Sequence, residues 1–181
     1  MAYGIKVENV VASASLNTQI KLDKLVQNWN NVEYEPEQFP GLVFRLDDPK
    51  SAALIFSSGK IVCTGTKSPK HAKTVVEKIV IRLNKLGFKV SKKYSMKIEN
   101  IVASAKLGRE LNLDNIAFKV ENTEYEPEQF PGLVFRLDEP KITFLLFGSG
   151  KIICTGGQSI AEIERAIGKL DKRLKDVERQ K

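Results

Sequence analysis

The side chains that could carry catalysis or hold a metal are few in this chain of 181 residues. It has two cysteines, Cys63 and Cys154, and one histidine, His71. A structural zinc site takes four Cys or His ligands, so these three cannot complete one. No serine or carboxylate constellation accompanies His71, which we interpret as a solvated surface residue. We therefore expect no enzyme activity, metal site or cofactor, and we assign both thiols to core packing.

Basic and amide side chains are more informative because they recur at matched places. The chain has 29 Lys and Arg against 22 Asp and Glu, a formal net charge of +7. This excess favours a polyanionic partner such as nucleic acid. The side chains that suit phosphate contacts are Arg45, Lys60, Arg136 and Lys151. Short neutral hydrogen-bonding groups among apolar neighbours are offered by Asn9, Thr64, Asn100 and Thr155.

The composition is typical of a globular protein, with 42% hydrophobic and 28% charged residues. No run of eighteen or more apolar residues could span a bilayer, and the start "MAYGIKVENVVASA" lacks the pattern of a signal peptide. We expect an intracellular protein.

Two direct repeats organise the chain. The stretch "YEPEQFPGLVFRLD" occupies 34–47 and returns unchanged at 125–138. "KVENVVASA" matches "KIENIVASA", and "FSSGKIVCTG" matches "FGSGKIICTG", with the same offset and no gap. A long repeat present only twice indicates two related half-domains and not a solenoid. We predict an N-terminal repeat at 1–91 and a C-terminal repeat at 92–181.

Each repeat reads as a strand, a short helix, several strands and a long helix. In the first repeat we expect strands near 5–11, 42–46, 52–56 and 60–64, joined by short turns typical of an antiparallel meander. A short helix is indicated by the apolar stripe Leu22, Leu25, Val26 and Trp29. Ser68-Pro69 begins a long helix that stops at Gly87. In the second repeat Ser159 and Glu162 form a capping box for the last helix.

Strand alternation sorts the side chains into two faces. The positions expected under the helices are Val10, Ala12, Leu42, Phe44, Leu46, Ala53, Ile55, Ile61 and Cys63. The opposite parity gives a mainly apolar face with Asn9, Val11, Val43, Arg45, Leu54, Phe56, Val62 and Thr64, repeated as Asn100, Val102, Val134, Arg136, Leu145, Phe147, Ile153 and Thr155. Either a ligand covers this second face, or the two repeats bury it against each other as a sandwich.

The polar positions on this face favour one ligand. An A·T-rich minor groove presents only hydrogen-bond acceptors and accepts apolar contact, whereas a G·C pair adds an amino group. Apolar walls with amide donors near the centre match the A·T groove and exclude the G·C pair.

These motifs resemble the TATA-box-binding protein family, in particular its archaeal members, over essentially the whole chain. The resemblance implies an α+β fold of two pseudo-symmetric repeats, in which a ten-stranded curved antiparallel sheet forms a saddle with four helices on its convex side. It sets the sandwich aside. The implied function is that of a general transcription factor, without enzyme activity, that binds the TATA box in the minor groove, bends the DNA and starts transcription initiation.

The resemblance also assigns DNA-binding residues. It makes wedges of Phe39, Phe56, Phe130 and Phe147, and base-edge contacts of Asn9, Thr64, Asn100 and Thr155. Apolar groove contacts are implied for Val11, Leu54, Val62, Val102, Leu145 and Ile153, and backbone contacts for Arg45, Lys60, Arg136 and Lys151. Glu8 and Glu99 stand where many relatives have Gln, so their effect on DNA is left open between a lost contact and mild repulsion.

Partners follow from the same resemblance. Transcription factor B is expected on the C-terminal copy of the shared stretch, the C-terminal stirrup, through Glu126, Glu128 and Gln129, followed by RNA polymerase. Because "YEPEQ" also stands at 34–38, the stirrup alone cannot select the half, and residues on neighbouring helices must do so. A homodimer off DNA stays open. The resemblance also implies a location in the cytoplasm on the archaeal nucleoid, or in the nucleus of a eukaryote. The alternative functions are an accessory nucleic-acid-binding domain of a nuclease or glycosylase, and a protein-only interaction module.

Overall fold

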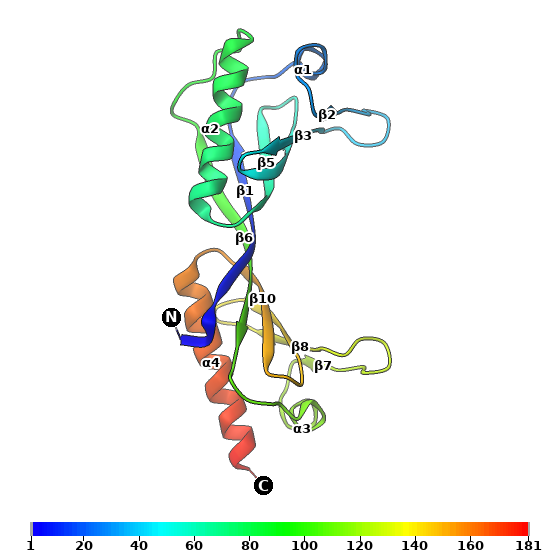
Figure 1. Cartoon of the computed structure of the whole chain (residues 1–181), viewed down its shortest axis with the longest axis vertical. Helices are drawn as coiled ribbons and strands as arrows, with labels where there is room; N and C mark the ends of the chain where they lie inside the picture. The colour runs from blue at the N-terminus through cyan, green and yellow to red at the C-terminus, as the bar shows by residue number, and fades with distance from the viewer. Residues whose placement is uncertain (1, 181) are drawn as a thin grey trace. The chain divides into compact units, whose positions relative to one another are not determined.

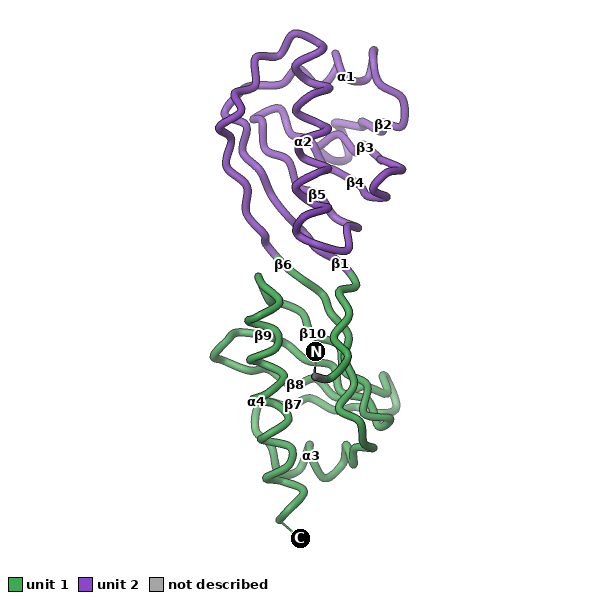
Figure 2. The backbone as a smooth tube through the Cα atoms, turned by 60° about the vertical axis from the view of Figure 1, so that its left-hand side comes forward, with its two compact units in different colours: residues 1–8, 100–181 green, residues 9–99 purple. Residues whose placement is uncertain are grey.

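The structure, a computed structural model, describes residues 2–180 in two compact units (Figure 2). Unit 2 comprises Asn9–Glu99, and unit 1 comprises the chain up to Glu8 and from Asn100 onward. Each unit therefore includes the first residues of the strand that opens the other repeat. No helix among residues 2–180 is long and apolar enough to cross a membrane.

The first repeat gives the expected order of elements (Figure 1). After a 3₁₀ turn at Ala2–Gly4 come β1 (Lys6–Ser15), α1 (Leu22–Asn28), β2 (Val32–Glu33), β3 (Leu42–Asp47), β4 (Lys50–Ile55), β5 (Lys60–Thr66) and α2 (Pro69–Lys85). The second repeat gives β6 (Ser95–Lys106), α3 (Leu113–Lys119), β7 (Thr123–Glu124), β8 (Leu133–Leu137), β9 (Ile142–Leu146), β10 (Lys151–Gly157) and α4 (Ile160–Arg179).

Within the described residues the ten strands have the order β2-β3-β4-β5-β1-β6-β10-β9-β8-β7. Strands that follow each other through tight turns, such as β3 and β4 or β8 and β9, pair antiparallel. The expected α+β class, with a ten-stranded antiparallel sheet and four α-helices, is confirmed for this part of the chain.

The long helices begin where the sequence predicts them. The Ser68 Oγ accepts the backbone N–H of His71 at 3.0 Å, and Pro69 follows as the first helical residue of α2. The chain leaves α2 through Gly87, whose φ of 97° lies in the left-handed region that favours glycine. At α4 the Ser159 Oγ accepts the Glu162 N–H at 3.2 Å.

The alternation of buried and half-exposed residues confirms the assignment of faces. Among the helix-side positions, Phe44 and Ile55 are buried beneath the helices, while the opposite parity is half-buried or exposed. Cys63 and Cys154 are buried in this core, and His71 is exposed. Burial raises the pKa of the Cys154 thiol to about 12, so it stays neutral at physiological pH and serves packing.

Two expected core residues are not fully buried. Val26 is 45% exposed, because α1 has only seven residues and packs through Leu22 and Leu25 alone. Leu46 is half-buried, because the short strand β2 pairs with β3 only at Val43 and Phe44 and does not reach Leu46.

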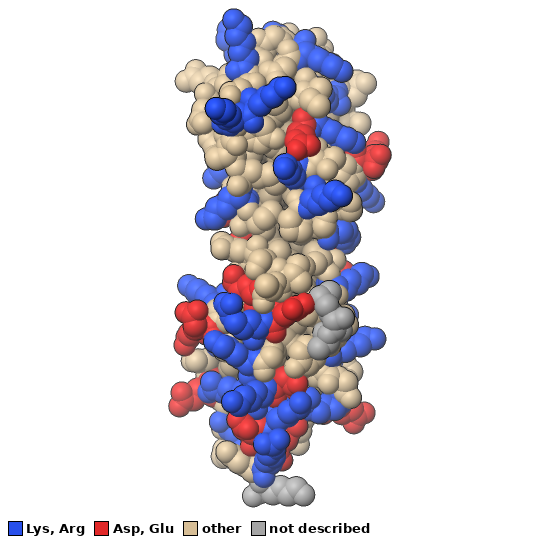
Figure 3. All heavy atoms as spheres, turned by 90° about the vertical axis from the view of Figure 1, so that its left-hand side faces the viewer, with Lys and Arg blue, Asp and Glu red and all other residues tan. Residues whose placement is uncertain are grey.

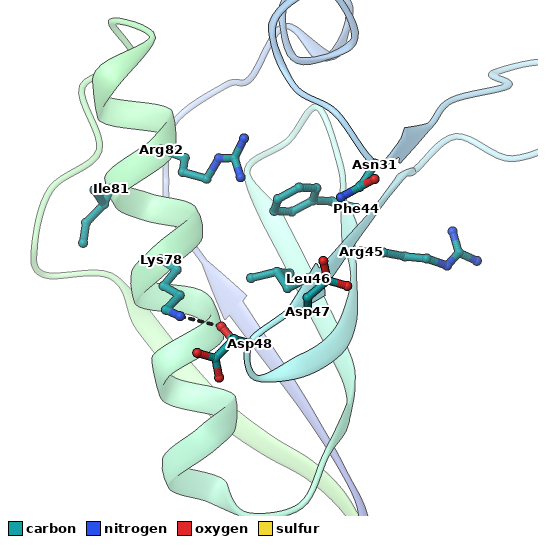
Figure 4. Close-up of a pocket in the computed structure, with 9 residues that line it drawn as sticks. All are labelled: Asn31, Phe44, Arg45, Leu46, Asp47, Asp48, Lys78, Ile81 and Arg82. Atoms are coloured by element: carbon teal, nitrogen blue, oxygen red, sulfur yellow. Dashed lines mark hydrogen bonds between the residues drawn. The ribbon is translucent and has the colours of Figure 1, made fainter.

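The long helix of unit 2 is fixed to its sheet partly by cations. The Arg82 guanidinium lies 4.8 Å from the ring centre of Trp29 and 4.9 Å from that of Phe44. One helical turn earlier, Lys78 donates a hydrogen bond to the backbone oxygen of Asp48 (Figure 4). In the same view Arg45 points away from α2, which places the guanidinium on the opposite side of the sheet.

A charged cluster ties α4 to both chain segments of unit 1. Asp171, with 7% of its side chain exposed, accepts hydrogen bonds from Tyr3 Oη at 2.9 Å and Arg109 Nη1 at 2.8 Å, and Lys175 Nζ lies 3.2 Å away. Arg109 Nε also donates to Glu178 at 3.0 Å. Burial pushes the pKa of Asp171 upward, but these three donors outweigh it, and the pKa lies below its ordinary value.

The depressed pKa of Asp171 leads to a prediction about stability in acid. The ionised Asp171 carboxylate stabilises the folded state fully above the unfolded pKa of about 3.9, and this contribution is lost as the pH falls through the folded pKa. We expect Asp171→Asn to lower the free energy of unfolding at pH 7, and the gap to wild type to narrow toward pH 2 in urea melts. Asp176→Asn, an exposed neighbour on α4, is the control with a small gap throughout. A gap for Asp171→Asn that is constant with pH would contradict the assignment.

Candidate nucleic-acid interface

The open face, meaning the side of the sheet opposite the long helix, carries a row of apolar side chains in each unit. In unit 2 Val43 lies opposite Leu54 on the next strand, and Leu54 lies opposite Val62. In unit 1 Val134, Leu145 and Ile153 make the same row. All six are half-exposed, so each row is packed laterally but available to a ligand. Val11 and Val102 on the first strands are half-exposed as well.

A β-bulge sets the polar centre of each open face. In unit 2 Val10 pairs with Thr66 and Ala12 with Cys63, so Thr64 and Gly65 together oppose Val11. In unit 1 the pairs Ile101–Gly157 and Ala103–Cys154 leave Thr155 and Gly156 opposite Val102 in the same way. Gly65 and Gly156 have φ values of 93° and 107°, which an L residue rarely adopts. Each bulge therefore turns one glycine N–H out of the ladder.

The freed glycine N–H orients the neighbouring asparagine. Gly65 N donates to Asn9 Oδ1 at 2.7 Å, and Gly156 N donates to Asn100 Oδ1 at 2.7 Å. Because a backbone N–H can only donate, the amide oxygen must face it and the NH2 group must face away. Asn9 Nδ2 then donates one proton to Thr64 Oγ1 at 3.1 Å, as Asn100 does to Thr155 at 3.2 Å. Each amide has a second N–H that no hydrogen bond described here uses.

A phenylalanine pair stands at the end of each open face. Phe39 contacts Phe56 edge to face with 5.8 Å between ring centres, and Phe130 contacts Phe147 at 6.0 Å. Phe39 and Phe130 are 42% and 45% exposed, so neither belongs to the core of its unit.

Glycine makes the close approach of these rings feasible. A Cβ on Gly41 would lie 2.7 Å from Phe39 Cε2 and 3.0 Å from Phe56 Cε1. A Cβ on Gly132 would meet the other pair at 2.6 and 3.1 Å. The second residue of each Pro-Gly turn is therefore required by the ring pair, because any larger residue would push the rings apart.

The four basic residues expected on phosphates are exposed, but they are not equivalent. Arg45 Nη1 lies 2.9 Å from Glu33 Oε1, and Arg136 Nη1 lies 2.9 Å from Glu124 Oε1. Such exposed ion pairs contribute little to stability, so each arginine can exchange its glutamate partner for another anion such as a phosphate. Lys60 and Lys151 begin β5 and β10, and their backbone oxygens accept the N–H of Phe56 at 2.9 Å and of Phe147 at 3.0 Å.

Glu8 and Glu99 are held near the open face by serine hydroxyls. Ser104 Oγ donates to Glu8 Oε1 at 2.9 Å within unit 1, and Ser13 Oγ donates to Glu99 Oε1 at 2.6 Å within unit 2. Lys6 and Lys97 lie 4.0 and 3.9 Å from the same carboxylates. Both serines have the parity of the open face, and Glu8 and Glu99 directly precede Asn9 and Asn100 in the sequence.

The residues expected to bind a protein partner lie in the loop between β7 and β8. Glu126, Glu128 and Gln129 are all exposed. The Glu126 backbone oxygen accepts the N–H of Gln129 at 2.9 Å and that of Phe130 at 3.0 Å. One tight turn thus presents the acidic side chains and the exposed ring together.

Sequence reasoning placed Val43 and Val134 on this face but assigned them no contact. It did not single out the glycines beside the ring pairs or the bulges that orient the asparagines. A glycine inside the strand pattern "KIVCTGT" was the available signal, because Gly in a strand interior often marks a bulge.

The chemistry of the open faces is that of a binding surface. Within residues 2–180 no group of three or more His, Cys, Asp or Glu side chains could hold a metal ion. The polar groups are amides, hydroxyls and cations arranged along two apolar rows. These can recognise hydrogen-bond acceptors and phosphates on an extended ligand.

Comparison with known proteins gives the family. The sequence model of the family described as transcription factor TFIID, or TATA-binding protein (TBP), matches residues 4–86 and 95–177. The chain is 52% identical over 170 residues to the TATA-box-binding protein of Methanosphaera stadtmanae, covering 94% of this chain and 93% of that one. It is 50% identical over 175 residues to the TATA-box-binding protein of Archaeoglobus fulgidus, covering 96% of each.

A solved structure agrees with these relatives. "Methanococcus jannaschii TBP" is 51% identical to this chain, has a TM-score of 0.91 with it, and the match covers 95% of this chain and 98% of that one. Matches that follow both repeats and extend along nearly the whole sequence show that the chain belongs to the TATA-box-binding protein family, whose members are transcription factors and not enzymes.

Proposed function

We propose that this protein is a general transcription factor that binds the TATA box through the open faces of both units, in the minor groove of A·T-rich promoter DNA. The observation that carries the proposal is the fixed orientation of the Asn9 and Asn100 amides. Each presents an N–H donor amid apolar side chains. Family membership and the names of the relatives support the same function.

The amide orientation explains a preference for A·T pairs. In the minor groove, A·T pairs present the N3 and O2 acceptors, which an N–H donor satisfies. A G·C pair would place its N2 amino group against Asn9 or Asn100, donor against donor. It would also meet the apolar rows, which offer no acceptor, so its desolvated amino group would be left unsatisfied.

The phenylalanine pairs supply the means of bending. Apolar wedges in family members unstack base steps and kink the duplex toward the major groove, a mechanism for which this family is itself the standard example. Phe39 and Phe130 expose nearly half of their surface, and their partner rings support them from the sheet. The rings are already ordered before DNA binds, so little side-chain entropy is lost on insertion.

Two similar open faces cannot by themselves set the direction of transcription from a promoter, so a second protein is needed. We propose that transcription factor B binds the exposed acidic loop between β7 and β8 through Glu126, Glu128 and Gln129, and that this complex recruits RNA polymerase. The protein would act on the chromosome in the cytoplasm of an archaeal cell. The open faces could join two copies off DNA, and DNA binding would then compete with the homodimer.

The first test is a fluorescence-anisotropy titration with an A·T-rich duplex and with duplexes carrying G·C pairs at central positions. Each G·C pair placed opposite Asn9 or Asn100 should weaken binding about tenfold or more, because mismatched pairs typically cost about 1–3 kcal/mol. The titrations are made at one fixed salt concentration, since phosphate contacts make affinity salt-dependent. Equal affinity for all duplexes would refute the proposed preference of Asn9 and Asn100 for A·T pairs.

The second prediction concerns the wedges. Phe56→Ala or Phe147→Ala should each remove roughly half of the DNA bend, because one wedge pair serves one end of the site. The bend is measured by energy transfer between dyes on the duplex ends, and folding by thermal melts. Phe118→Gln, at an 89% exposed phenylalanine on α3, is the matched control with unchanged bending. An unchanged bend in the wedge variants would remove this role from Phe56 and Phe147.

The third prediction concerns the central carboxylates. Replacing Glu8 and Glu99 together with Gln should strengthen TATA binding about fivefold at low salt, because two negative charges near the phosphates are removed. The gain should shrink as salt rises, since screening weakens the repulsion. Glu164→Gln, exposed on α4, controls for net charge. Weaker binding by the double variant would show that Glu8 and Glu99 contact the DNA favourably.

A further inference from the structure

The two acidic loops alone do not distinguish the units. The loops between β2 and β3 and between β7 and β8 carry the same letters from Tyr34 and from Tyr125. Their local structure also matches, because the Glu35 oxygen accepts from Gln38 N at 2.9 Å as Glu126 does from Gln129 N. A partner that reads only these loops would bind both units equally.

The segment just before each loop differs in one conspicuous way. Phe118 on α3 is 89% exposed, the most exposed of the large hydrophobic side chains described. At the matching place on α1 the first repeat has Gln27, and where the second repeat has Glu121 the first has Asn30. Unit 1 therefore adds an exposed phenyl ring and a carboxylate beside an acidic loop that unit 2 also has.

The core of unit 1 does not need the Phe118 ring. Leu113, Ile116 and Val120 are buried and fill the inner side of α3. An aromatic ring left almost fully in water gains nothing from folding, so Phe118 contributes little to the stability of unit 1. Aromatic side chains are also the commonest anchors of protein interfaces.

The charges around Phe118 select the kind of partner. Glu121, Glu126 and Glu128 are exposed, and α3 leads through β7 into their loop (Figure 1). The nearest cation in the chain, Lys119, donates to the Gln180 backbone oxygen at 2.5 Å and is thereby held toward the end of α4. The segment from Phe118 to Glu128 therefore combines one exposed apolar ring with exposed carboxylates, and its lysine is engaged elsewhere.

The long helices reinforce the difference between the units. In unit 2, α2 contains five Lys or Arg residues and one Glu, whereas in unit 1, α4 contains six Lys or Arg residues and five Asp or Glu. Figure 3 shows this on the helix side, where the α2 region is mainly blue and the α4 region mixes blue and red. A basic partner is repelled by α2 more than by α4.

We propose that Phe118, Glu121, Glu126 and Glu128 form a docking surface for a basic protein that receives the phenyl ring in an apolar recess. Phe118 and Glu121 select unit 1 over unit 2. This rests on the proposed function, in which the partner is transcription factor B, and adds the residues that decide which acidic loop it meets.

The experiment measures binding of purified archaeal transcription factor B to the full chain preassembled on a TATA duplex, by biolayer interferometry. Phe118→Gln installs the residue of the first repeat, and should weaken the partner at least about tenfold, as loss of an aromatic anchor does. Glu121→Asn should weaken it severalfold, with the loss diminishing at high salt. Melting temperature and TATA affinity should stay unchanged for both variants.

Ile81→Lys is the matched control. Ile81 is 54% exposed on α2, and the second repeat has Lys172 at the matching place. Its substitution removes an exposed apolar side chain outside the docking surface and should leave partner binding unchanged. A loss as large as that of Phe118→Gln would overturn the proposal, because general surface hydrophobicity would then explain both.

The remaining outcomes separate the inference from the proposed function. If the wild-type chain binds the factor and Phe118→Gln binds it equally, the inference is wrong and the proposed function stands. If the wild-type chain binds TATA DNA but not the factor, both the partner assignment and the docking surface are wrong. If Phe118→Gln abolishes self-association in light scattering and leaves the factor bound, the ring serves a second copy of this chain and the proposal is overturned.

Discussion

The structure depends on the one-sided covering of its sheet. In each unit a single long helix covers one face, and that face alone supplies the buried core, including Phe44, Phe135 and both cysteines. Because strand side chains alternate, every second residue points away from the helices and does not pack in the core. The open face could therefore keep apolar rows and asparagine amides that a closed sandwich would have to bury. Recognition and stability are carried by different residues of the same strands.

The open face works as a preformed surface because backbone groups hold it in place. The bulge at Gly65 supplies an N–H that fixes the Asn9 amide, and Gly41 leaves room for the ring of Phe39 against Phe56. In the proposed complex, binding then costs less entropy to order these groups, which matters because the proposed bend also costs energy. Glycine is needed at these positions for geometry that side chains alone could not provide.

The sequence predicts the elements and faces well because both rest on local rules. The repeat, the caps at Ser68 and Ser159, and strand parity each depend on a few neighbouring residues, and the structure agrees with them. The exceptions depend on how far the elements extend. Leu46 lies beyond the residues of β3 that pair with β2, and Val26 lies on a helix of only seven residues. The Asn9–Gly65 hydrogen bond joins two strands across a bulge, and no local pattern gives its direction.

Differences between the repeats carry information that their similarity cannot. In the proposed complex, a duplex offers nearly the same groove to both units, so both units can carry the same asparagines, threonines and ring pairs. The proposed protein partner meets only one unit, and residues that serve it need no copy in the other. Phe118 and Gln27 occupy matching positions and are both exposed, yet only one is apolar. In a duplicated fold, an exposed position that is apolar in one copy and polar in the other is therefore where an asymmetric partner should be sought first.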